Sequence, residues 1–282
     1  MHQRILIIGA TGMLGKPVTQ QLIKDGFEVT IFSTNKAKAS KIFPISTIIE
    51  GDMQNAESIR NALKGQNSVY MNLAIPTNAK KTDWNPERDG VKTVVTEAKK
   101  EGIKRIGYLS SKISGYGNWW VMQDKRSAVK DIKSSGIPYL IFSASVFMDN
   151  FNGTQKDRDK INVLGKSKVR MFYIAASDFA KQVSRAFSLE NDSSYTFNIQ
   201  GSEAFTISEA ADVFVKNHTK EKLKVRKAPM GLFKFMGLFN RKLSFVANLM
   251  EALNNHPEKF DSEETWEKLG KPTLTLKEYA KK

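Results

Sequence analysis

Near its start the chain carries the sequence RILIIGATGMLG (residues 4–15), in which an apolar run leads directly into three spaced glycines. The apolar run has the length of a buried strand. The residues from Val18 to Lys24 have the pattern of a helix, which Asp25-Gly26 closes. This segment therefore predicts a strand, a tight turn and a helix at the beginning of the fold.

The three glycines suit the binding of a pyrophosphate at the N-terminus of that helix. Gly9 would permit the tight turn, Gly12 would let the backbone approach the phosphates, and Gly15 would let the helix pack closely on the strand. A helix N-terminus offers unpaired N–H donors and the positive end of the helix dipole. Because the motif lies in a complete βαβ unit, we expect a bound dinucleotide rather than a merely structural turn. The expected contacts come from Gly9, Thr11, Gly12, Met13, Leu14 and Gly15.

Strand and helix patterns alternate as far as residue 150. Strands are expected at 28–32, 46–50, 68–73, 105–110 and 138–143, with helices at 56–63, 89–101 and 124–134. Strands separated by helices favour a parallel sheet with right-handed crossovers. We therefore predict an α/β fold of Rossmann type. A doubly wound parallel sheet over 1–150 would be followed by a smaller, mostly helical substrate region over 151–282, with 172–200 returning to the core sheet.

The composition excludes several classes of function. The 282 residues include no cysteine, and His2, His218 and His256 stand far apart, so we expect no disulfide, thiolate chemistry or metal site. No apolar run is long enough to span a bilayer and no signal-peptide pattern is present, which predicts a cytoplasmic protein. The net charge of +15 comes mainly from lysines spread over the predicted helices. Without a groove-reading motif or interleaved aromatic residues, this charge does not indicate a nucleic-acid partner.

The loop after the second predicted strand bears on the choice between NAD and NADP. An acidic residue there bonds the ribose 2′-hydroxyl, whereas a basic residue accepts a 2′-phosphate. This loop has Ser33, Asn35, Lys36 and Lys38 and no carboxylate. We therefore expect NADP(H) to be favoured over NAD(H), the alternative being that the two lysines simply begin a solvated helix.

Short motifs follow one another in a specific order along nearly the whole chain. They include the glycine loop, EGDM at 50–53, YLSS at 108–111, SGIPY at 135–139 and FNIQG at 197–201. In this order they resemble the atypical short-chain dehydrogenases/reductases, in particular NmrA-like NAD(P)-binding proteins related to isoflavone-reductase-like enzymes and nucleotide-sugar epimerases. The resemblance implies that Asp52 and Met53 lie beside the adenine, and that Leu73, Ala74 and Ile75 pass the ribose and phosphates. An alternative role for Asp52 is the N-cap of the helix that starts near residue 55.

The catalytic pair that the resemblance implies is incomplete. Related reductases place a tyrosine four residues before a lysine on one helix face, where the lysine lowers the pKa of the tyrosine. The family's lysine matches Lys125, but the residue four positions earlier is Val121. Tyr108 and Lys112 have the same spacing, yet Tyr108 falls within a predicted strand, so we interpret it as a core residue.

Other groups are candidates for the missing proton donor. Lys125 would bind the nicotinamide ribose or act as an acid/base, and Tyr116 would replace the absent tyrosine. Ser110 and Ser111 would hydrogen-bond a substrate oxygen. The structural alternatives are a surface helix position for Lys125 and a loop anchor for Tyr116.

Residues 220–245 form a basic segment rich in methionine and phenylalanine. Eight lysines or arginines are opposed there by Glu221 alone. We expect the segment to be helical, and three roles stay open. It would form a lid over an apolar substrate, make peripheral contact with an anionic membrane, or pack its aromatic face onto the domain.

The favoured function is an NADPH-dependent oxidoreductase acting on a small carbonyl or conjugated apolar substrate. Because the tyrosine is missing, a second hypothesis is an NmrA-like regulator that senses NAD(P) without turnover, since binding needs the glycine loop but no catalytic pair. A nucleotide-sugar epimerase or dehydratase is the third. The sequence gives no indication of oligomeric state.

Overall fold

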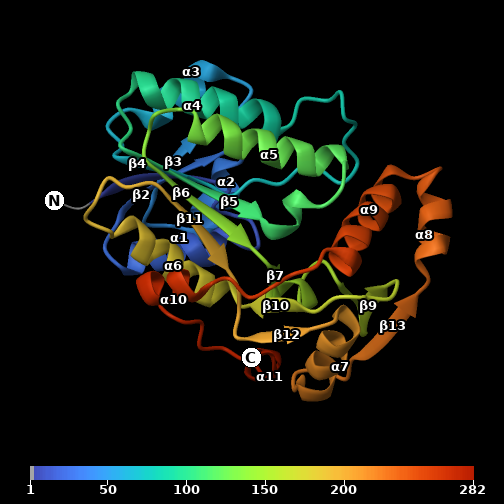
Figure 1. Cartoon of the computed structure of the whole chain (residues 1–282). Helices are drawn as coiled ribbons and strands as arrows, with labels where there is room; N and C mark the ends of the chain where they lie inside the picture. Colours follow the sequence, from blue (N-terminus) through green and yellow to red (C-terminus); the bar gives the residue numbers. More distant parts are fainter. Residues whose placement is uncertain (1–2) are drawn as a thin grey trace.

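A seven-stranded parallel sheet forms the centre of the computed structural model, which describes residues 3–282 (Figure 1). Met1 and His2 lie outside the described residues. The strand order is β11-β6-β5-β4-β1-β2-β3, and every neighbouring pair is parallel. This confirms the doubly wound Rossmann-type fold. The strands are β1 (Arg4–Ile8), β2 (Glu28–Ser33), β3 (Thr47–Glu50), β4 (Ser68–Met71), β5 (Arg105–Ser111), β6 (Tyr139–Ala144) and β11 (Tyr195–Ile199).

The order of the strands reverses at β1. From β1 the chain moves outward through β2 and β3, then crosses back to β4 on the other side. Ile8, the last residue of β1, is paired with Phe32 of β2 and Met71 of β4. In open parallel sheets, ligands bind beyond the carboxyl ends of the strands at such a reversal. We therefore expect the ligand site just beyond Ile8, at the carboxyl end of β1.

Helices cover both faces of the sheet, as Figure 1 shows. On one face Leu22 and Phe179 contribute to a buried cluster, and on the other Ile59, Val94 and Ile132 do so. The first face carries α1 (Gly15–Lys24) and α6 (Ala176–Phe187), with α2 (Lys36–Ile42) beside β3. The second carries α3 (Ala56–Leu63), α4 (Val91–Lys100) and α5 (Trp120–Lys133), and a single π-helical turn, η1 (Pro86–Gly90), precedes α4.

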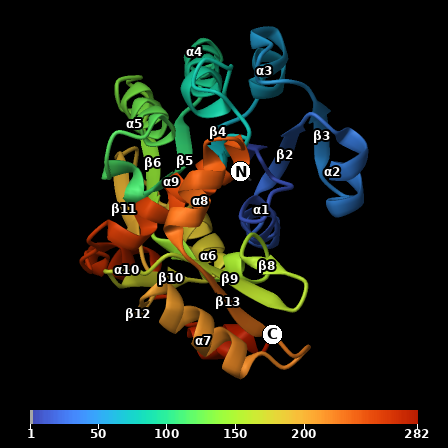
Figure 2. The same ribbon diagram turned by 90° about the vertical axis from the view of Figure 1, so that its right-hand side faces the viewer.

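The C-terminal region combines helices with two small sheets (Figure 2). One sheet has the order β12-β10-β7 and the other β13-β9-β8. These strands are β7 (Val146–Phe147), β8 (Lys156–Asp157), β9 (Lys160–Leu164), β10 (Met171–Ile174), β12 (Glu203–Phe205) and β13 (Lys224–Ala228). The helices of this region are α7 (Ile207–Asn217), α8 (Met230–Gly237), α9 (Arg241–Asn255), α10 (Glu263–Leu269) and α11 (Leu276–Ala280). Two short 3-10 turns occur earlier in the chain: η2 (Lys112–Gly115) follows β5, and η3 (Met148–Phe151) follows β7.

Two segments of this region differ from the sequence-based expectation. Residues 224–228 form β13 and not a helix, because they pair in parallel with β9 and Pro229 ends the segment. Within 172–200, β11 joins the central sheet and α6 packs on one face of it, whereas β10 pairs with β7 and β12 in a small sheet. The chain thus leaves the central sheet after β6 and returns to it with β11.

Candidate functional site

Two adjoining cavities lie at the carboxyl ends of the central strands. Their volumes are about 340 Å³ and about 450 Å³. Asn72, Leu73 and Ala74, which directly follow β4, line both of them. The larger cavity reaches the end of β2, and the smaller reaches β5, β6 and α5. Together they provide an extended crevice at the reversal of strand order.

The glycine turn is packed so tightly that two of its glycines are required by the protein itself. Gly9 has φ 89° and a Cβ there would overlap the carbonyl oxygen of Asn72. A Cβ on Gly15 would overlap the carbonyl oxygen of Gly9. Gly12 differs, since a Cβ there would meet only the Gly9 carbonyl oxygen, at 3.4 Å. The space beside Gly12 therefore faces the cavity, where a bound group would need it.

The start of α1 is suited to an anion. Within the described residues this helix has no side-chain cap at Leu14 and no acidic residue in its first turn. The Lys16 amide donates to the Gly12 carbonyl oxygen and Pro17 has no N–H, so the donors nearest to an anion would be the amides of Met13, Leu14 and Gly15, to which the helix dipole adds positive potential. Gly12, Met13 and Leu14 line the smaller cavity, and Gly9 and Thr11 line the larger. The turn and the helix end fit a pyrophosphate between the two cavities.

The predicted contacts at the end of β2 are distributed unevenly. Ser33 lines the larger cavity, whereas Asn35 accepts a hydrogen bond from the Lys38 amide and caps α2. Lys36 is exposed, and its amide donates to Glu50 Oε1 at 3.2 Å. The loop after β2 contains no acidic residue of its own. A carboxylate nevertheless lies beside it, because the pairing of β2 with β3 brings Glu50 next to Ser33.

Only some of the residues predicted to contact the adenine and the ribose line a cavity. Met53 lines the larger cavity, but Asp52 is exposed and accepts a hydrogen bond from the Gln54 amide. Asn55 caps α3, so Asp52 does not have the alternative role as its N-cap. Ile75 is buried in a cluster with Val121 and does not line either cavity, although its neighbours Ala74 and Pro76 line the larger one.

Lys125 lines the smaller cavity. It lies in the second turn of α5, because this helix starts at Trp120 and not at residue 124 as predicted. Its Nζ lies 2.5 Å from Oε1 of Glu87, a residue of η1 that is completely buried. The other carboxylate oxygen, Oε2, accepts a hydrogen bond from the buried Tyr108 hydroxyl. Burial, together with the charge of Glu87, raises the pKa of Tyr108 well above its ordinary value. Tyr108 is therefore a support for this ion pair and no proton donor.

Of the other predicted catalytic residues, two lie in the same cavity as Lys125 and one does not. Ser110 and Ser111, at the end of β5, line the smaller cavity with Lys125. Tyr116 is absent from the residues that line it and packs edge-on against His256, with ring centroids 5.9 Å apart. Burial lowers the pKa of His256, and the charge of Lys112 contributes to this shift.

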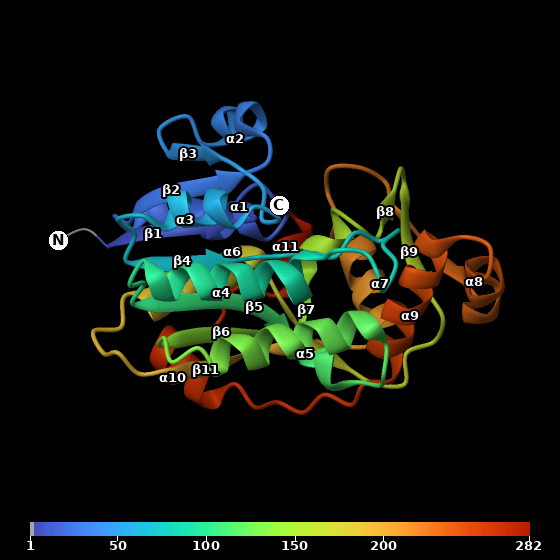
Figure 3. The ribbon, with the colours of Figure 1, turned by 90° about the horizontal axis from the view of Figure 1, so that it is seen from above.

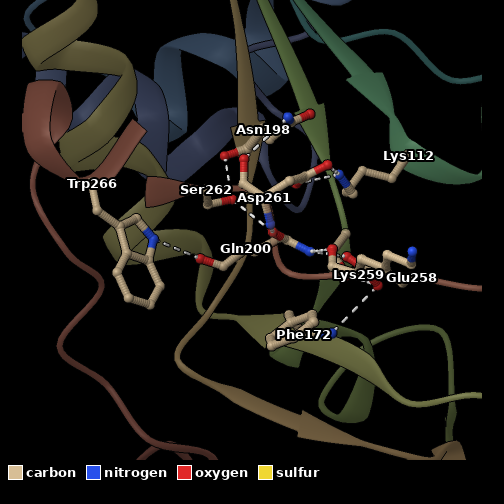
Figure 4. Close-up of polar contacts among 10 residues, drawn as sticks. Lys112, Phe172, Asn198, Gln200, Glu258, Lys259, Asp261, Ser262 and Trp266 are labelled. Carbon is tan, nitrogen blue, oxygen red and sulfur yellow. Dashed lines mark hydrogen bonds and ion pairs between the residues drawn. The ribbon is translucent and has the colours of Figure 1, made fainter. Parts of the chain in front are cut away.

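A further hydroxyl group reaches the smaller cavity from the residue that follows β6. Ser145 lines the cavity and its hydroxyl donates to Oε2 of Glu258 at 2.8 Å. Figure 4 shows Glu258 between the side chain of Gln200 and the backbone amide of Phe172, which donate to it at 2.7 Å and 3.4 Å. Burial raises the pKa of Glu258, although the Gln200 and Ser145 hydrogen bonds partly oppose this. A largely buried carboxyl group with a raised pKa is thus hydrogen-bonded to a hydroxyl in the cavity.

Sequence reasoning missed several residues of this site, among them Asn72, Glu87, Ser145 and Glu258. Asn72 was recognisable in principle, because it is the first polar residue after the apolar β4. Glu87, Ser145 and Glu258 carried no local signal. Ser145 lines the cavity just after β6, whereas Glu87 of η1 and Glu258 of the segment after α9 act behind it through Lys125 and Ser145, and only the tertiary fold brings these together.

Among residues 3–282, no group of His, Asp or Glu side chains could hold a metal ion. In the same part of the chain, no helix is both long and apolar enough to cross a bilayer.

A glycine turn between β1 and an uncapped α1, placed at the reversal of a doubly wound sheet, defines a dinucleotide-binding protein of Rossmann type. The chain belongs to the NAD(P)H-binding family, whose model matches residues 9–188. This confirms the family predicted from the sequence, that of the atypical short-chain dehydrogenases/reductases.

Relatives and solved structures agree with this assignment. The photosystem II assembly factor Ycf39 of Synechocystis sp. is 24% identical over 260 residues, which cover 89% of this chain and 78% of that protein. The fold is similar to that of Citrobacter sp. triphenylmethane reductase complexed with NADP(H), with a TM-score of 0.75, 18% identity and 98% of each chain covered. The Escherichia coli NADPH-dependent quinone oxidoreductase QOR2 complexed with NADPH gives a TM-score of 0.73, 20% identity and 98% coverage of each chain.

Proposed function

We propose that this protein is an NADPH-dependent reductase of a small carbonyl or conjugated apolar substrate. The observation that carries the proposal is the convergence of Lys125, Ser110, Ser111 and Ser145 on one cavity that adjoins the glycine turn. A sensor needs the glycine turn, but it has no need of ionisable and hydroxyl groups at the far end of the crevice. The names of the triphenylmethane reductase and the quinone oxidoreductase with similar folds are compatible with this class.

The lining of the smaller cavity limits the substrate class. Apolar side chains, Leu14, Leu109 and Phe147 among them, make up much of its wall. The volume of about 340 Å³, part of which the nicotinamide would fill, suits a small molecule. We infer a largely apolar substrate whose single oxygen faces the serines.

When bound, the cofactor supplies a hydride, which adds to the electrophilic carbon of the substrate. The chain's own groups then have to supply one proton to the oxygen. The Ser145 hydroxyl, which donates to Glu258 in the structure, would turn to donate its proton to the substrate oxygen and would take a proton from the protonated carboxyl group of Glu258. Glu258 would regain its proton from solvent. The ammonium group of Lys125, held by Glu87, would orient the cofactor and stabilise negative charge on the oxygen.

The preference for NADP(H) is part of the same proposal. Lys36 and Lys38 are exposed beside Ser33, at the end of β2 where the 2′ position of the adenosine ribose would lie. Glu50 opposes them, so the preference would be moderate.

Oxidation of NADPH, followed at a fixed protein concentration with a set of small aldehydes, ketones and quinones, tests this function. We expect turnover with at least one acceptor and its loss by about 100-fold in Ser145→Ala, the size typical of a removed proton donor. Ser208→Ala, on α7 outside the cavity lining, is the matched control. Tight NADPH binding without oxidation by any acceptor would instead favour the sensor.

A further inference from the structure

Five large apolar side chains gather on the exposed side of α8 and in the turn that follows it. Leu232, Phe235, Met236, Leu238 and Phe239, here called the α8 patch, are between 41% and 82% exposed. Leu232, Phe235 and Met236 have the spacing i, i+3, i+4, which places them on one face of α8, and Leu238 and Phe239 follow in the turn. The rings of Phe235 and Phe239 lie 5.8 Å apart. Water-soluble helices normally present polar residues there, so this face is unusual.

The opposite side of α8 is already used for packing. Met230 and Phe233 are partly buried against the core of the C-terminal region. At Gly237 the helix approaches α9 so closely that a Cβ would lie 3.0 Å from Cα of Ser244. The hairpin of α8 and α9 is therefore fixed through this inner face, and the α8 patch is left outside. Figures 1 and 3 show the pair at the edge of the molecule, away from the central sheet.

The α8 patch does not act as part of the crevice. None of its residues is among those that line the two cavities at the carboxyl ends of the strands. The predicted role of this segment as a lid over the substrate therefore has no support in the described residues.

Positive charge surrounds the α8 patch. Lys227, Arg241 and Lys242 are exposed at the two ends of α8, and Lys222 and Lys224 follow the adjacent edge through β13. Between Pro229 and His256 the only acidic residue is Glu251, and it is paired with Lys234 at 2.8 Å. Apolar side chains ringed by cations complement a surface that offers hydrocarbon below a layer of negative charge.

A second copy of the chain fits this surface poorly. A symmetric dimer would bury the same patch on both partners and would bring the cations around each patch together. Like charges at that distance repel, and no acidic residue in the hairpin is free to compensate.

From this arrangement we propose that the α8 patch docks the protein on the surface of an anionic lipid bilayer. Phe235, Leu238 and Phe239 enter the boundary between headgroups and acyl chains, while Lys227, Arg241 and Lys242 contact the lipid phosphates. The contact is peripheral, and it is independent of the proposed reductase activity.

Co-sedimentation with vesicles tests the proposal. One set of vesicles contains phosphatidylcholine alone and the other an equimolar mixture with phosphatidylglycerol. We expect the wild-type chain to bind the anionic vesicles at least about tenfold more tightly, and to lose this advantage as salt is raised. Equal affinity for both vesicles, or no binding to either, would overturn the proposal.

Two pairs of variants separate the apolar and the charged contributions. Phe235→Ser with Phe239→Ser should weaken binding to anionic vesicles by at least about tenfold. Ile45→Ser, which changes an equally exposed apolar residue far along the chain, should leave it unchanged. Lys227→Glu with Lys242→Glu should weaken binding by at least about tenfold, whereas Lys99→Glu with Lys104→Glu makes the same change in net charge and should have little effect.

The melting temperature and NADPH affinity of each variant report on the integrity of the fold. The proposal fails if the double serine variant binds anionic vesicles like the wild type while it remains folded. It also fails if the wild type forms a dimer in solution that the double serine variant abolishes, because the α8 patch would then be an interface between copies.

Discussion

Oε1 of Glu87 lies 2.5 Å from Nζ of Lys125, and Glu87 is completely buried while the Lys125 side chain is 17% exposed. The lysine that the family resemblance implies is therefore part of an ion pair that the fold needs. Removing one partner of a buried ion pair leaves the other charge without compensation, which costs more than the pair contributes. Loss of activity in a variant of Lys125 alone would consequently mix catalysis with stability.

Lys125→Met should lower the free energy of unfolding by about 3 kcal/mol, since it leaves Glu87 buried with only the Tyr108 hydroxyl as a partner. Lys125→Met combined with Glu87→Gln should recover much of this loss, because no buried charge remains. Urea unfolding of both variants measures the difference. Wild-type stability of the single variant would show that the pair is not formed in solution.

The glycines of the turn should separate binding from folding. Gly15→Ala should lower the free energy of unfolding by about 1–3 kcal/mol, because the new Cβ overlaps the Gly9 carbonyl oxygen. Gly12→Ala has room in the protein and should keep the melting temperature, but it should raise the dissociation constant for NADPH by about tenfold. Calorimetry of binding and of unfolding distinguishes the two, and an unchanged NADPH affinity in Gly12→Ala would contradict the placement of the pyrophosphate.

Cofactor preference should respond to two opposite charges at the end of β2. Lys36→Glu should weaken NADPH by about tenfold at low salt and affect NADH much less, because only NADPH carries the 2′-phosphate. Glu50→Gln removes the opposing carboxylate and should shift the preference towards NADPH. Titration of each variant with both cofactors checks these signs, with Lys99→Glu on α4 as a control for net charge. Equal changes for NADPH and NADH would refute the role of this loop.

The stability of the protein should depend on pH through Glu258. Burial raises the pKa of this residue above 4.5, its ordinary value. The folded state then holds the proton more tightly than the unfolded chain, so the contribution is fully present below pH 4.5 and is lost as pH rises through the folded pKa. Glu258→Gln keeps a neutral hydrogen-bonding group and should lose less stability than the wild type over that range. Urea midpoints measured from acid to neutral pH test this difference.

Patterns within single elements were enough to predict the architecture. The glycine turn, the alternation of strands and helices and the helix-ending glycines depend on local rules, and the strands of the central sheet lie within a few residues of their expected positions. The register of β2 and β3 was not visible in the sequence, and it is this register that brings Glu50 beside Ser33.

The site was predictable only where it follows directly from a strand end. Gly9, Ser33, Leu73 and Ser110 line the crevice because the carboxyl ends of parallel strands converge there. Asn35 and Asp52 have side chains of the right type, but α2 and a local turn use their oxygens. Their roles in cofactor binding, like that of Lys125, stay predictions that titration will test.

The return of the chain to the central sheet with β11 has a consequence for biosynthesis. Residues 140–144 of β6 pair with β11, so until residue 199 has left the ribosome this edge of β6 is open. This edge carries the apolar residues Leu140, Ile141 and Phe142, and an unpaired apolar strand invites association with other nascent chains. A protein cut at residue 150 would keep the glycine turn and still expose that edge. The cofactor-binding half is thus completed only by a segment made after the first part of the substrate region, so the sheet cannot close before residues 151–194 have been synthesised.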